Sequence, residues 1–121
     1  MSDTKNPAVD REPPPSEGSG PPIVELVVAD VDKYRLSKIA AELADDLRVR
    51  AEVGRKKYGT LLMAYNGRDP IVDAYQEALD LVMYLRQARE EARGVGSVTV
   101  LQMYYEAALA LAFDLRNIIR P

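Results

Sequence analysis

Three carboxylates that could bind a metal ion stand at helical spacing in the second half of the chain. Asp73, Glu77 and Asp80 occupy positions i, i+4 and i+7, which places them on one side of a helix. With Ala78 set at the middle of the apolar arc of that helix, the acids border the arc instead of scattering around it. Helical bundles hold divalent cations with carboxylates placed in this way. The spacing therefore indicates a candidate site for an oxygen-ligated metal ion.

A third metal ligand, beside Glu77 and Asp80, is expected from the preceding helix, and two residues compete for this role. If the chain turns near Tyr65, Glu52 arrives level with Glu77 and Asp80. Helical phase favours Asp46 instead, because Asp46 borders the apolar stripe of its helix whereas Glu52 lies nearly opposite that stripe. Spacing and phase thus give different answers, and both residues stay candidates.

Both the acidic and the basic residues of this region also have simpler interpretations. The acids could be boundary residues that pair with Arg or Lys on a neighbouring helix. The basic run Arg55-Lys56-Lys57 closes its helix, where positive charge complements the helix dipole. The same run, with Arg68 from the following loop, could instead bind phosphate groups next to the acids.

Composition limits the chemistry that the chain can perform. It has 121 residues with no cysteine and no histidine, so thiolate sites, disulfides and imidazole catalysis are excluded. The net charge of −3 makes a broad nucleic-acid surface unlikely, because such surfaces usually carry a basic excess. No signal-type segment is present, and the longest apolar run, residues 107–113, is too short to span a bilayer. A soluble, cytoplasmic protein that does not bind membranes is expected.

The chain is expected to consist of a tail and one helical domain. Residues 1–22 contain six of the eight prolines and read as a disordered Pro/Gly/Ser-rich tail. Residues 23–121 form the single predicted domain, with residues 23–29 as an irregular or helical lead-in. Capping signals predict three helices, whose limits are Asp30 or Asp32 to about Tyr58, Asp69-Pro70 to about Arg93, and Thr99 to near Arg120.

The predicted fold class is all-α, and the first two of these helices are expected to form an antiparallel hairpin. The third helix adds to that hairpin. The last two helices are apolar over more than half of their circumference, which three helices alone cannot cover. A bundle completed by dimerisation is therefore predicted, as a homodimer or a higher homo-oligomer with the last helix in the interface.

Two segments resemble a known family. Glu77-Ala78-Leu79-Asp80, followed by an apolar helix, resembles the second half of the MazG-like signature, and Glu52-Val53-Gly54 resembles the start of its first half, Glu-x-x-Glu. The turn after Lys56 and the later Asn-Gly-Arg-Asp are similar to those of small phage and prophage members. The resemblance covers about residues 40–90, and Arg55 stands where the second glutamate of the first half would be.

The resemblance implies Mg²⁺-dependent hydrolysis of a nucleoside triphosphate to the monophosphate and pyrophosphate, in nucleotide-pool or phage nucleotide metabolism. It implies that the metal ligands are Glu77 and Asp80 with Glu52 or Asp46. Asp73 and Glu77 would be the catalytic residues, with Asp73 as general base. The phosphates would be bound by Lys56, Lys57 or Arg68.

Two function classes therefore compete. The acidic edge favours the nucleotide pyrophosphohydrolase. Arg55 favours a non-catalytic helical dimer that acts as a binding or regulatory module. A nucleic-acid-binding protein is a distant third, supported only by a local run of basic residues between positions 48 and 57.

Overall fold

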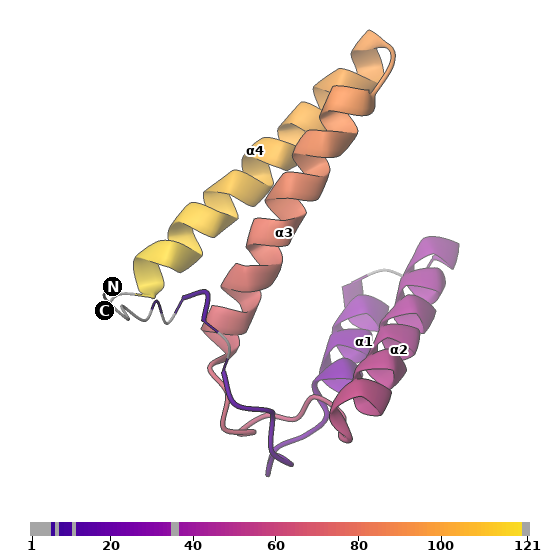
Figure 1. Cartoon of the computed structure of the whole chain (residues 1–121). Helices are drawn as coiled ribbons and strands as arrows, with labels where there is room; N and C mark the ends of the chain where they lie inside the picture. The colour runs from indigo at the N-terminus through magenta and orange to yellow at the C-terminus, as the bar shows by residue number, and fades with distance from the viewer. Residues whose placement is uncertain (1–5, 7, 11, 35–36, 120–121) are drawn as a thin grey trace. The chain divides into compact units, whose positions relative to one another are not determined.

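The computed structural model describes residues 6, 8–10, 12–34 and 37–119, and within them every regular element is an α-helix (Figure 1). The prediction of an all-α protein is confirmed. The helices are α1 (Ile23–Tyr34), α2 (Lys38–Tyr58), α3 (Pro70–Glu91) and α4 (Val95–Ile118). Residues 1–5, 7 and 11 of the predicted tail lie outside the described residues, as does Arg120, the expected end of the last helix.

The chain divides into two compact units. One unit lies within residues 12–68 and contains α1 packed against α2; the other contains α3 packed against α4, together with residues 6 and 8–10. Within each unit, the two helices lie side by side in Figure 1. The hairpin predicted from the sequence joins a helix of one unit to a helix of the other, so it stays a prediction, as does the single domain of residues 23–121.

The helical part of the first unit begins earlier than predicted and is interrupted. The expected helix starts at Asp30 or Asp32 are wrong, because both residues lie inside α1. Residues 23–29, expected as an irregular or helical lead-in, are the helical start of α1. The second helix begins instead after Ser37, whose side-chain oxygen accepts a hydrogen bond from the backbone N–H of Ala40. Such a cap satisfies a donor that the first turn of the helix leaves unpaired.

Both ends of the loop that follows α2 agree with the sequence-based prediction. Gly59 ends α2 in the left-handed conformation, with φ of 81°, and its N–H bonds to the carbonyl of Arg55. Asp69 caps α3 by accepting hydrogen bonds from the backbone N–H groups of Ile71 and Val72, and Pro70 follows at the first helical position. Strong local signals at these positions set the ends of the helices.

The last helix starts before Thr99, its predicted beginning. Gly94 stands at the N-cap position of α4 without a side-chain cap, and Thr99 lies one turn inside the helix. The hydroxyl of Thr99 donates to the carbonyl of Val95, as threonine side chains do within helices. The short connection after Glu91 leaves α4 antiparallel to α3 (Figure 1).

Small side chains dominate the interior of both units. The buried apolar residues are mostly alanines, and none of the large apolar side chains among the described residues is fully buried. Alanine at a helix contact lets two helices approach closely but removes little apolar surface from water. The buried apolar residues of the four helices are Val28, Ala40, Ala44, Val72, Ala78, Ala108 and Ala112.

Helix α4 exposes most of its large apolar side chains. Met103, Tyr104 and Phe113 are each more than half exposed. By length and composition α4 is also the one described helix that could cross a membrane, and a single helix of this kind is weak support for a membrane location. The predicted cytoplasmic location stays a prediction.

Candidate functional site

The predicted acidic edge lies on α3, next to the face that packs on α4. Ala78 is buried, as expected for the middle of the apolar arc, while its neighbour Glu77 and the following Asp80 are exposed. Among the described residues neither Glu77 nor Asp80 forms an ion pair or a side-chain hydrogen bond. The interpretation of these two acids as ion-paired boundary residues therefore has no support within the described part of the chain.

Asp73 occupies the first turn of α3, on the N-terminal side of Glu77 and Asp80. Its backbone N–H donates to the carbonyl of Asp69, and its side chain is half-buried. A carboxylate in the first turn is favoured by the positive end of the helix dipole, because the first backbone N–H groups have no carbonyl partners within the helix. The Asp69 cap thus fixes where the helix begins and, through the helical repeat, where the three acids lie.

Glu52 on α2 is held by Arg55 in the same helix. The Nε of Arg55 donates to both carboxylate oxygens of Glu52 at 3.0 and 2.9 Å, and one terminal nitrogen lies 2.6 Å from Oε1. This hydrogen-bonded contact lowers the pKa of Glu52 and raises the pKa of Arg55. The residue at the expected ligand position therefore neutralises a predicted metal ligand instead of adding another.

The other predicted residues of α2 are exposed. Asp46 makes no side-chain contact with a charged partner among the described residues, whereas its neighbour Asp45 pairs with Arg48 at 3.6 Å. Lys56 and Lys57 extend into solvent, and the Nζ of Lys57 lies 5.2 Å from the centre of the Tyr58 ring. Charge on both lysines is thus accessible to an anion, as phosphate binding requires.

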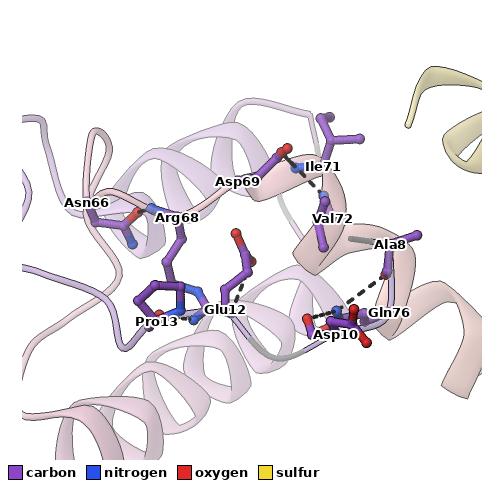
Figure 2. Close-up of polar contacts among 10 residues, drawn as sticks. All are labelled: Ala8, Asp10, Glu12, Pro13, Asn66, Arg68, Asp69, Ile71, Val72 and Gln76. Atoms are coloured by element: carbon purple, nitrogen blue, oxygen red, sulfur yellow. Dashed lines mark hydrogen bonds and ion pairs between the residues drawn. The ribbon is translucent and has the colours of Figure 1, made fainter. Parts of the chain in front are cut away.

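Arg68 is a predicted site residue with several contacts. Its guanidinium pairs with Glu12 at 3.2 Å and donates to the carbonyl of Pro13 at 2.5 Å, as Figure 2 shows. Its backbone N–H donates to the side-chain oxygen of Asn66, a buried polar residue that shapes the turn. Glu12 and Pro13 belong to the segment predicted as a tail, so the sequence analysis missed them.

The predicted site residues are divided between the units. Asp46, Glu52, Lys56, Lys57 and Arg68 belong to one unit, and Asp73, Glu77 and Asp80 belong to the other. Within either unit, the described carboxylates form no group of three or more that could hold a metal ion. The structure brings Glu77 and Asp80 together on one helix; the complete ligand set stays a prediction.

Comparison of the chain with protein-family models, curated proteins and solved structures gives no match. The resemblance to the MazG-like family therefore also stays a prediction.

Proposed function

We propose that this protein is a Mg²⁺-dependent nucleotide pyrophosphohydrolase that cleaves a nucleoside triphosphate into the monophosphate and pyrophosphate. The observation that carries the proposal is the pair Glu77 and Asp80. Both carboxylates are exposed, stand about one turn apart on the same helix, and make no ion pair among the described residues. Oxygen ligands of this kind suit a hard cation such as Mg²⁺.

In this proposal Glu77 and Asp80, with Glu52 or Asp46, would hold Mg²⁺, which would neutralise phosphate charge and help to activate a water molecule. Asp73 accepts the proton of the water that attacks the α-phosphorus, so the P–O bond to the leaving pyrophosphate breaks as the new P–O bond forms. Glu52 must leave Arg55 to act as a ligand, whereas Asp46 is available as it stands.

The remaining predicted residues bind the triphosphate in this proposal. Lys56 and Lys57 are exposed and offset phosphate charge, and Arg68 offers a planar guanidinium that matches a phosphate group. The acidic overall charge argues against nucleic acid as the ligand. We also propose that the protein acts in the cytoplasm and forms a homodimer or higher homo-oligomer. The exposed apolar side chains of α4 support the self-association.

Pyrophosphate release tests this function. The full-length protein is incubated with each common nucleoside triphosphate while Mg²⁺ is titrated, and Glu77→Gln is assayed in parallel. Release is expected to require Mg²⁺ and to fall on the order of 100-fold or more in Glu77→Gln, because that change removes a metal ligand. Helix content is expected to stay unchanged, since Glu77 is exposed.

Glu91→Gln is the matched control, because Glu91 is an exposed glutamate at the end of the same helix. It is expected to release pyrophosphate at the wild-type rate. If no nucleotide is hydrolysed by the folded wild-type protein at any Mg²⁺ concentration, the enzymatic proposal fails.

A second candidate function rests on the contact between Glu52 and Arg55. This contact favours a non-catalytic helical dimer that acts as a binding or regulatory module, because it occupies a carboxylate that the reaction needs. Arg55→Glu distinguishes the two candidates. It restores the Glu-x-x-Glu pattern, and a gain of Mg²⁺-dependent release over an inactive wild type would show that the native chain has lost catalysis through Arg55.

A further inference from the structure

The N-terminal segment of residues 12–22, here called the strap, runs along the loop of residues 62–68. Successive backbone hydrogen bonds join the two: the N–H of Ser16 to the carbonyl of Asn66 at 3.0 Å, and the N–H of Gly20 to that of Ala64 at 3.2 Å. At the end of the strap, the N–H of Ile23 bonds to the carbonyl of Leu62 at 2.9 Å. The strap is therefore attached along most of its length.

Two glycines allow the strap to lie this close to the loop. A Cβ atom on Gly18 would stand 2.1 Å from the carbonyl oxygen of Ala64 and 2.7 Å from the Cβ of Met63. A Cβ atom on Gly20 would stand 2.5 Å from the Cβ of Ala64. Distances this short force the backbone apart, so any larger residue at either position would push the strap away from the loop.

The far end of the strap holds the guanidinium of Arg68. The side chains of Glu12 and Arg68 are only 18% and 20% exposed, so their ion pair is largely shielded from solvent. The carbonyl of Pro13 accepts a further hydrogen bond from the same guanidinium (Figure 2). An anionic carboxylate and a carbonyl oxygen thus take the place on Arg68 where phosphate oxygens would bind.

The strap is also weakly fastened. None of the residues from 12 to 22 is buried, so hydrogen bonds and the Glu12–Arg68 ion pair hold the segment with little apolar burial. Segments with few buried apolar contacts open at low free energy. A ligand that competes for Arg68 could therefore displace the strap without unfolding α1 or α2.

We propose that the strap is a built-in competitor for an anion site at Arg68, and that a phosphate chain binds there by displacing Glu12. This inference rests on the proposed function, in which the anion is the triphosphate of the nucleotide. When the strap is closed, Arg68 cannot bind the anion. The apparent affinity is therefore the intrinsic affinity multiplied by the fraction of molecules in which Arg68 is open. Removing the negative charge of Glu12 raises that fraction and strengthens binding.

Tripolyphosphate, titrated into the full-length protein without Mg²⁺, measures this competition. By calorimetry Glu12→Gln is expected to bind it about 3- to 10-fold more tightly than the wild type, because more of the protein is open. Arg68→Gln is expected to bind it at least tenfold more weakly. In the amide NMR spectrum of the wild type, saturating tripolyphosphate is expected to shift Ser16 and Gly20 toward positions typical of an unstructured chain.

Glu17→Gln controls for net charge, because Glu17 is an exposed glutamate of the strap with no ion pair among the described residues. It is expected to leave the affinity unchanged. Gly18→Ala opens the strap without altering charge and is expected to strengthen binding as Glu12→Gln does. Its control is Gly96→Ala, where no atom lies within 4 Å of the added Cβ.

Three results would overturn the inference: equal affinity in the wild type and Glu12→Gln, no binding by any variant, or saturation that leaves the Ser16 and Gly20 amides unmoved. The pyrophosphate assay is separate from this measurement. Displacement of the strap without pyrophosphate release from any nucleotide would support the inference and reject the enzyme. If pyrophosphate is released and the wild type and Glu12→Gln bind the nucleotide with the same affinity, the enzyme is supported and the inference is rejected.

Discussion

The two units are both pairs of helices packed through alanine, yet their outer surfaces differ. On α2, charged residues pair within the helix, as Arg48 does with Asp45 and Arg55 with Glu52. On α4, large apolar side chains such as Met103 and Phe113 face outward. Large apolar side chains such as Val49 are exposed on α2 as well, but there they stand among ten charged residues in 21, whereas α4 has three charged residues in 24. Similar packing thus carries a charged surface in one unit and a mostly apolar surface in the other.

The strongest test of the comparison is whether the α3–α4 pair has a true interior in spite of its exposed surface. Ala78→Asp places an unpaired charge at the buried contact and is expected to cost about 3 kcal/mol or more of unfolding free energy. Ala74→Asp, on the exposed side of the same helix, is expected to cost less than about 0.5 kcal/mol. Urea unfolding followed by circular dichroism measures both, and equal losses would contradict a packed interior.

The next test asks whether the apolar surface of α4 is an interface. Met103→Ser is expected to weaken self-association about 10- to 100-fold, because burial of a Met side chain contributes about 1.5–3 kcal/mol. Val49→Ser on α2 is the control; the two side chains are 62% and 63% exposed. Sedimentation over a range of protein concentrations reports the effect, and the proposed dimer is wrong if both variants associate like the wild type.

Two glycines, one inside α2 and one directly after its end, offer a smaller test within one unit. Gly59→Ala is expected to destabilise the protein by about 1 kcal/mol, because φ of 81° suits glycine alone. Gly54→Ala is expected to stabilise it by about 0.5–1 kcal/mol, because alanine is the better helix former. An added Cβ meets no atom within 4 Å at either position, so the backbone conformation alone should decide the sign. Thermal unfolding would refute this if both shifts had the same direction.

The smallest expected effect is on the pKa of a glutamate, and it is tested with one ion pair from each unit. Arg55 lowers the pKa of Glu52, and Arg86 lowers the pKa of Glu90, mainly through side-chain hydrogen bonds. A lowered pKa stabilises the fold above the pKa of the unfolded chain, ordinarily about 4.3, and this contribution is lost as the pH falls through the folded value. Both pairs are exposed, so little stability depends on them.

Arg55→Gln and Arg86→Gln are each expected to raise the pKa of their own glutamate and leave the other unchanged. Carboxyl NMR titration of both variants measures this. An unchanged pKa of Glu52 in Arg55→Gln would mean that Arg55 does not hold this carboxylate in solution.

Residues near the helix ends predicted some of the helix limits correctly and others wrongly. The loop between α2 and α3 begins after Tyr58 and ends at Asp69-Pro70, as the sequence indicated, because capping depends on residues a few positions apart. The start of α2 was misassigned because Asp30 is as good a cap by type as Ser37. The sequence around each residue does not show which of the two caps the helix.

The candidate site shows the same limit at longer range. The phase of α3 placed Ala78 inside and Glu77 at the border, since both depend on one helical repeat. The contact between Arg68 and Glu12 joins residues far apart in the chain, and composition alone gave the strap the character of a disordered tail. The Gly-Ser-Gly stretch of residues 18–20 is typical of a flexible linker by composition. Its close approach to Ala64 depends on the tertiary structure, which composition does not show.

The attachment of the strap also implies an order of folding. The hydroxyl of Ser16 donates to the carbonyl of Asn66 across 50 positions of sequence, and closing such a loop from an open chain costs about 3.5 kcal/mol of entropy. The packing of α1 on α2 removes most of that cost by shortening the open path. The hydrogen bonds between the strap and the loop can then form in order from Ile23 toward Glu12. In that order the contact of Glu12 with Arg68 forms last and opens first.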